Sequence, residues 1–105
     1  MTWHITLSPQ VGPMAALQAS VADAVITING QAIDLGPLND GDELPAAATD
    51  CPYVEGTIRR IGTGIYIRLL FPIRPAATEA ARFPAPVVVT GAGPVAVPPN
   101  GDEHG

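Results

Sequence analysis

Hydrophobic and polar residues alternate most regularly between Ala24 and Leu35, in the stretch AVITINGQAIDL. Asn29-Gly30 at its centre suits a two-residue type I′ turn, because Asn tolerates and Gly readily adopts the positive φ that both positions require. The stretch therefore predicts a β-hairpin. One face of this hairpin is apolar and carries Ala24, Ile26, Ile28, Ile33 and Leu35. That face must pack on another part of the chain, since an isolated hairpin is only marginally stable.

A second hairpin is predicted over Tyr53 to Phe71. A Thr63-Gly64 loop would set Arg59 opposite Arg68, which like-charge repulsion disfavours. We therefore prefer a type II′ turn at Gly62-Thr63, with Gly first. The cross-strand pairs that follow are Ile58 with Ile67 and Val54 with Phe71. From Gly64 the second strand has one apolar face (Ile65, Ile67, Leu69, Phe71) and one mixed face (Tyr66, Arg68, Leu70).

Shorter segments complete the pattern. Alternation predicts strands at Trp3–Leu7, ended by Ser8-Pro9, and at Val87–Thr90 and Val95–Val97, with a turn at Gly91–Pro94. Ala15–Val21 fits a helical turn or a strand, and we favour the strand. Gly36–Pro52 is a loop by composition, held to the core by Leu35, Leu38 and Leu44, with room for one helical turn at Ala46–Thr49. Pro72–Pro86 contains four prolines and cannot be a continuous strand, but Ala76–Arg82 suits one or two turns of helix.

These elements predict an all-β fold, a small β-sandwich or open barrel of about eight short antiparallel strands built from hairpins. At most one short helix is expected, near residues 76–82. We expect residues 1–97 to form a single domain and residues 98–105 to be a flexible tail, because the tail has nothing apolar to bury.

Composition narrows the possible partners. Charged residues make up only 14% of the chain, which indicates either a surface covered by a partner or the residue usage of a GC-rich genome. The net charge of −5 argues against nucleic-acid binding. All five basic residues are arginines between Arg59 and Arg82, after seven acidic residues, so the two groups either pair or form two differently charged surfaces. We expect no signal peptide, no membrane span and, with Cys51 alone, no internal disulfide.

Candidate chemistry is sparse. A hydrolase would need His4 with Ser8, Ser20 or Cys51, without any nucleophile-elbow or oxyanion motif, so this is the least favoured function. Cys51 is more simply a small buried thiol, and Trp3 is more simply a core anchor than an exposed contact residue. Asp40, Asp42 and Glu43 are weak candidates for Ca²⁺ ligands, because their spacing does not match an EF-hand loop; we favour a solvated turn, in which Asp is common. No catalytic residue and no cofactor are predicted.

Arginines on the second hairpin suggest a binding surface. Arg59, Arg60 and Arg68 with Tyr66 could recognise an anion or a sugar, because guanidinium groups bind planar anions and Tyr stacks on rings. Our candidate binding residues are Arg59, Tyr66 and Arg68. The simpler interpretation is that outward strand positions must be polar.

Four phrases carry a resemblance across nearly the whole chain: VITINGQAIDLGPLNDGDELP, CPYVEGTIRRI, IYIRLLFPI and RFPAPVVVTGAGPVAVPP (residues 25–45, 51–61, 65–73 and 82–99). Together they resemble small, largely uncharacterised proteins of proteobacterial phages and prophages that are encoded among tail and tail-fibre genes. The chain departs from that pattern at Thr63-Gly64 and Ala92-Gly93, where the family pattern has Asp-Gly.

The resemblance implies a structural or assembly role in a phage tail and transfers no catalytic residue. We therefore expect a non-enzymatic interaction module that contacts other tail proteins or itself and is located in the bacterial cytoplasm during assembly; presence in the mature virion is left open. The alternative is a carbohydrate- or anion-binding β-module.

Overall fold

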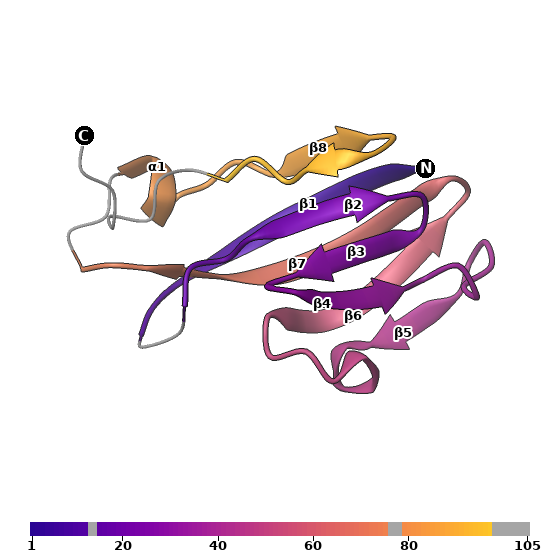
Figure 1. Ribbon diagram of the computed structural model, residues 1–105, viewed down its shortest axis with the longest axis horizontal. Helices are drawn as coiled ribbons and strands as arrows, with labels where there is room; N and C mark the ends of the chain where they lie inside the picture. The colour runs from indigo at the N-terminus through magenta and orange to yellow at the C-terminus, as the bar shows by residue number, and fades with distance from the viewer. Residues whose placement is uncertain (13–14, 76–78, 98–105) are drawn as a thin grey trace.

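A computed structural model describes residues 1–12, 15–75 and 79–97, which form two stacked β-sheets (Figure 1). The five-stranded sheet has the order β5-β6-β7-β1-β8 and the four-stranded sheet the order β4-β3-β2-β9. The strands are β1 (Thr2–Val11), β2 (Ala19–Ala22), β3 (Val25–Ile28), β4 (Gln31–Asp34), β5 (Glu43–Pro45), β6 (Val54–Ile61), β7 (Gly64–Ile73), β8 (Val87–Thr90) and β9 (Gly93–Pro94). A 3-10 turn, η1 (Ala46–Thr49), and a short helix, α1 (Glu79–Arg82), complete the described elements. The predicted all-β sandwich is confirmed.

The pairing of β1 with β7 corrects the expectation that all strands are antiparallel. All ten residues of β1 lie beside the ten residues of β7 in parallel, from Thr2 opposite Gly64 to Val11 opposite Ile73. The other strand pairs in the described structure are antiparallel. The first strand thus lies inside the larger sheet, between β7 and the edge strand β8.

Both long strands pass through a proline, where we had predicted that strand structure would end. β1 continues through Pro9 to Val11, and β7 continues through Pro72 to Ile73. Antiparallel pairing of β1 with β8 stops at Ile5, and that of β7 with β6 stops at Leu69. Each proline therefore lies where its strand has a β-neighbour on one side only, and its missing N–H can face the unpaired side.

Three local predictions also need correction. Gly36–Pro52 is not entirely a loop, because β5 pairs with β6 and places Leu44 opposite Ile58; the helical turn at Ala46–Thr49 is present as η1. β2 starts only at Ala19, and the last strand is β9 rather than Val95–Val97. Val95 still packs in the core, and its N–H donates to the Ala19 carbonyl (2.8 Å).

Of the expected helix, α1 covers residues 79–82. Residues 76–78 and the predicted tail at 98–105 lie outside the described residues.

The Asn29-Gly30 hairpin is confirmed in its predicted register, with Ile28 opposite Gln31 and Ile26 opposite Ile33. Asn29 has φ +47° and Gly30 has φ +87°, as a type I′ turn requires. The Asn29 side chain also ties this turn to the chain before β2. Its Oδ1 accepts from the Gln18 N–H (2.7 Å), and its Nδ2 donates to the Ala16 carbonyl (3.0 Å).

One apolar cluster fills the space between the sheets. Trp3 is fully buried, which confirms it as a core anchor, and its Nε1 donates to the Asp23 carbonyl (3.1 Å). Cys51 is a free, buried thiol, as predicted. The largest fully buried side chains besides Trp3 are Ile5, Ile26, Ile28, Leu35, Ile58, Ile65, Leu69 and Phe71, drawn from both sheets. Each contributes about 1.5–3 kcal/mol by leaving water.

The Asn29 turn gives a test of this account. Asn29→Gly keeps the positive φ and removes both side-chain hydrogen bonds, so we expect a loss of about 1–2 kcal/mol in the free energy of unfolding. Asn29→Ala removes the same bonds and adds left-handed backbone strain, so it should lose about 1 kcal/mol more. Urea unfolding of the two variants measures both losses of unfolding free energy. Equal stability of Asn29→Gly and the wild type would show that the side-chain bonds contribute nothing.

Candidate functional site

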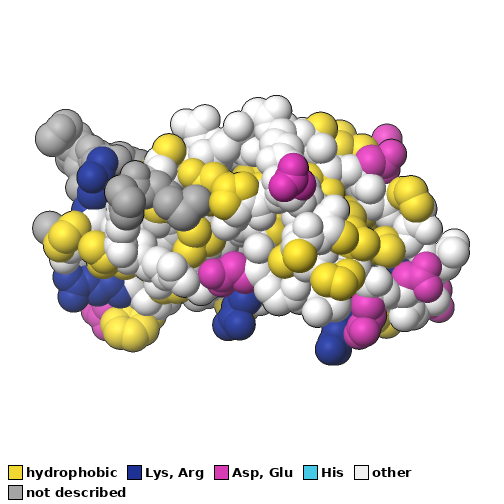
Figure 2. Space-filling model, turned by 90° about the horizontal axis from the view of Figure 1, so that it is seen from below, with side chains coloured by type: hydrophobic (Ala, Val, Ile, Leu, Met, Phe, Trp, Pro, Cys, Tyr) yellow, Lys and Arg dark blue, Asp and Glu magenta, His cyan; other side chains and the backbone are white. Residues whose placement is uncertain are grey.

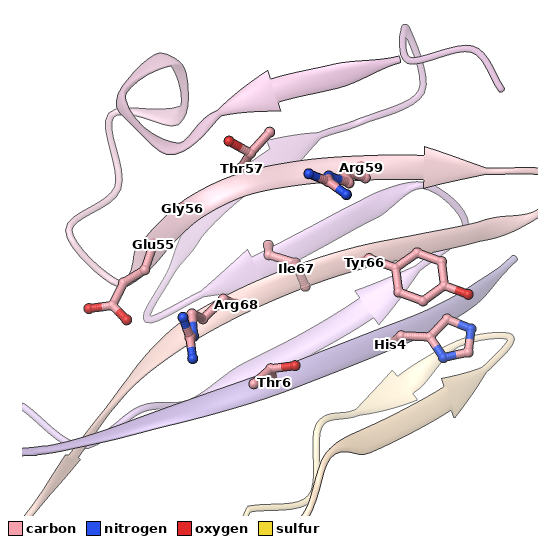
Figure 3. Close-up of a pocket in the computed structure, with 9 residues that line it drawn as sticks. All are labelled: His4, Thr6, Glu55, Gly56, Thr57, Arg59, Tyr66, Ile67 and Arg68. Atoms are coloured by element: carbon pink, nitrogen blue, oxygen red, sulfur yellow. The ribbon is translucent and has the colours of Figure 1, made fainter. Parts of the chain in front are cut away.

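A polar depression of about 480 Å³ lies on the outer face of the five-stranded sheet (Figure 3). Its residues come from three adjacent strands, β1, β7 and β6. They are His4, Thr6, Glu55, Gly56, Thr57, Arg59, Tyr66, Ile67 and Arg68. The three residues predicted from the sequence, Arg59, Tyr66 and Arg68, are therefore brought together. Arg60 does not belong to the depression; its Nη1 donates to the Leu38 carbonyl instead (2.6 Å).

An irregularity in β6 shapes the depression. Near the turn the predicted register is confirmed, because Ile61 faces Gly64 and Arg59 faces Tyr66, and Gly62 has φ +59°. Beyond Arg59 the register shifts, so Glu55 faces Arg68 and Val54 faces Leu69. The predicted pair Val54–Phe71 is therefore wrong, whereas Ile58 and Ile67 lie within the irregular stretch, next to the regular pair Arg59–Tyr66. Four residue steps of β6 (59 to 55) span two steps of β7 (66 to 68), and Gly56 has φ +69° within this bulge.

Two aromatic rings form one end of the depression. His4 and Tyr66 are direct neighbours across the parallel β1–β7 pair, and their rings stack with centroids 4.3 Å apart and planes 5° apart. Gly64 lies two residues before Tyr66 on the same face. A Cβ atom at Gly64 would come within 3.3 Å of Tyr66 Cε1 and 3.5 Å of His4 Cδ2. The bare backbone at Gly64 thus makes room for the stacked rings.

The charged side chains of the depression have different partners. Arg59 Nε pairs with Glu43 Oε2 at 2.9 Å, although both side chains are more than half exposed. Gln10 Nε2 donates to Glu55 Oε2 (3.3 Å). Arg68 is exposed and forms no ion pair and no side-chain hydrogen bond with any other described residue. Its guanidinium group is therefore the one in the depression that is open to a ligand.

The acidic and basic halves of the sequence meet in space. The Arg59–Glu43 pair joins them directly. Figure 2 shows the side that faces down in Figure 1, where arginine side chains along the lower margin lie beside acidic ones and apolar side chains occupy much of the rest. The Arg59–Glu43 pair is an instance of pairing across the fold, one of the two alternatives. Exposed pairs of this kind add little stability.

The three candidate metal ligands are engaged separately. Asp40 Oδ1 accepts from the Gly62 N–H (2.7 Å), Asp42 Oδ2 accepts from the Asn39 N–H (2.8 Å), and Glu43 pairs with Arg59. Within the described ranges, no three His, Cys, Asp or Glu side chains gather closely enough to hold a metal ion. These carboxylates stabilise turns and the β5–β6 pair in this structure.

The residues considered for hydrolysis lie apart. His4 lines the polar depression, whereas Cys51 lines a separate hollow beside η1. Ser8 is four residues along β1 from His4, about 13 Å at the rise of an extended strand. Ser20 belongs to the other sheet, on β2. None of the three proposed nucleophiles, Ser8, Ser20 and Cys51, shares the depression with the His4 imidazole.

An apolar groove of about 640 Å³ lies beside β8. All of its lining residues are apolar: Phe83, Ala85, Pro86, Val87, Val88, Ala96 and Val97. Phe83 is 77% exposed and Val88 57% exposed. The sequence did not predict this groove, because Phe83 lies in a proline-rich connection whose hydrophobic residues do not recur at the spacing of a helix or a strand.

None of the described helices is both long and apolar enough to cross a membrane. Comparison with family models, with curated proteins and with solved structures gave no significant match.

Substitution of Gly64 tests the geometry of the stacked rings. The new methyl group of Gly64→Ala would lie 3.3 Å from both Tyr66 Cε1 and the Ile61 carbonyl oxygen, so the Tyr66 ring, stacked on His4, must shift by a few tenths of an ångström to relieve the contact. We expect a loss of about 1 kcal/mol in unfolding free energy and altered ring-proton shifts of Tyr66 and His4. Thermal unfolding and NMR spectra measure these effects.

Gly12→Ala is the matched control, since a Cβ at Gly12 meets nothing within 4 Å. It should be neutral or slightly stabilising. Unchanged ring-proton shifts in Gly64→Ala would contradict the described packing.

Proposed function

We propose that this protein is a non-enzymatic interaction module that binds a protein partner, either another tail component or a second copy of itself. The groove beside β8 is the observation that carries the proposal. Its lining has no charged or polar side chain, and Phe83 is largely exposed although the core between the sheets is complete without it. Large exposed aromatic groups on an apolar surface are typical of protein interfaces.

The edge of the larger sheet supports the same proposal. β8 ends the strand order and pairs with β1 alone, so its other side has no β-neighbour in the described structure. An unpaired strand edge can accept a strand from a partner, and the adjacent groove could accept that partner's apolar side chains. The resemblance to phage and prophage tail-region proteins supplies the setting that we propose for this interaction, namely tail structure or assembly.

The polar depression favours a second candidate function, the binding of a carbohydrate or an anion. It contains Tyr66 together with Arg59 and Arg68, which is the combination that the sequence suggested for such a site. The two surfaces adjoin, because Val88 of the groove faces His4 of the depression across the β1–β8 pair. A protein partner bound at the groove would therefore lie close to the depression.

Light scattering of the purified protein, alone and mixed with the products of neighbouring genes, tests the leading proposal. We expect a stable oligomer or co-elution with a tail component. Phe83→Ser should weaken that association by roughly thirtyfold, because removing an interface aromatic costs about 2 kcal/mol.

Ile61→Ser is the control for Phe83→Ser. Ile61 is 58% exposed and does not line the groove, so the association should be unchanged. The proposal would be overturned if the wild-type protein stays monomeric and binds none of the neighbouring gene products. Equal weakening by both substitutions would place the interface elsewhere.

A further inference from the structure

The β6 bulge leaves a hollow between an aromatic end and a cationic end. Tyr66 and His4 lie at one end of the depression and Arg68 at the other (Figure 3). Gly56, on β6 beside Glu55, adds no side chain at the cationic end, and the hydroxyl-bearing residues Thr6 and Thr57 also line the depression. Tyr66 and Arg68 are two residues apart on the same face of β7, about 7 Å at the rise of a strand. One small molecule can touch both.

The aromatic end of the depression can contact a ring of a ligand. Tyr66 remains 40% exposed although His4 covers one face of its ring. The stack fixes the orientation of Tyr66, and Gly64 provides the room that the stack needs. No cation of the described residues lies over either ring. A flat or puckered six-membered ring is the kind of group that packs well against such a side chain.

The cationic end is suited to a single carboxylate. Arg68 is free to donate two parallel hydrogen bonds, whereas Arg59 is held by Glu43. Glu55 lies opposite Arg68 in the strand register, and it repels any ligand with further negative charge near that point. Among the lining residues Arg59 and Arg68 outnumber Glu55 by one positive charge, and Glu43 pairs with Arg59, so the site offers one guanidinium group for a carboxylate and not the several cations that a polyanion needs.

We propose that the depression binds a small molecule that carries one carboxylate on a six-membered ring, either a sugar acid or an aromatic acid. Arg68 donates to the carboxylate, and the ring packs against Tyr66. This inference rests on the second candidate function and narrows it to one ligand chemistry. It does not involve the apolar groove.

NMR titration of the ¹⁵N-labelled protein with glucuronate and with benzoate tests the proposal and separates the two sources of the carboxylate. Glucose lacks the carboxylate and inorganic phosphate lacks the ring, so both serve as comparison ligands. We expect saturable shifts of the β6 and β7 amides around the depression with glucuronate, benzoate or both, at a Kd of about 1 mM for so shallow a site. Glucose and phosphate should bind roughly tenfold more weakly or not at all.

Two variants assign the binding to its residues. Arg68→Gln should weaken binding roughly tenfold or more by removing a charged hydrogen-bond donor, and it should leave unfolding unchanged because Arg68 has no described side-chain partner. Arg82→Gln is the control for the loss of one exposed arginine: Arg82 lies on α1 outside the depression and its Nη2 donates to the Pro75 carbonyl (2.6 Å), so this variant should bind the ligands as the wild type does.

The titrations distinguish binding of a ring carboxylate from the broader candidate function, the binding of a carbohydrate or an anion. If glucose or phosphate binds as tightly as glucuronate and benzoate, the ring-carboxylate inference is overturned, but carbohydrate or anion binding is retained. If none of the four ligands binds saturably, both are overturned. Binding that Arg68→Gln leaves unchanged also overturns the inference.

Discussion

The parallel pairing of β1 with β7 is the contact on which both the fold and the polar depression depend. On the inner face it brings Trp3, Ile5 and Leu7 beside Ile65, Ile67 and Leu69, all buried. On the outer face the same pairing sets His4 beside Tyr66 and Thr6 beside Arg68. A shift of one residue in one strand would turn its apolar residues outward, so core packing fixes the register that assembles the site.

Local signals predicted the parts of the fold that form from neighbouring residues. Asn29-Gly30 fixed the first hairpin, because few residue pairs accept positive φ at both turn positions and the alternation on either side allows one register only. The Gly62-Thr63 turn followed from the same reasoning together with the repulsion expected between Arg59 and Arg68. Tyr66, Arg68 and Arg59 could be chosen as site candidates because they share the outer face of this hairpin.

Non-local contacts explain what the sequence did not predict. Thr2 and Gly64 are partners although 62 positions separate them, and nothing in either strand specifies the other as its neighbour. His4 was therefore not predicted as the stacking partner of Tyr66, and Thr6 was not placed in the site. The bulge of β6 has one local sign, Gly56, because a glycine within a strand pattern is typical of a bulge. Pro9 and Pro72 ended the predicted strands because their tolerance depends on which side of each strand is unpaired, a tertiary property.

Backbone NOEs between β1 and β7 test this account most directly. The parallel register predicts a regular series of contacts that pairs Trp3 with Ile65, His4 with Tyr66 and Thr6 with Arg68. Observation of that series would establish the arrangement that buries the core and assembles the polar depression. Contacts displaced by one residue, or contacts in antiparallel order, would contradict it, because His4 and Tyr66 would no longer share the outer face as neighbours.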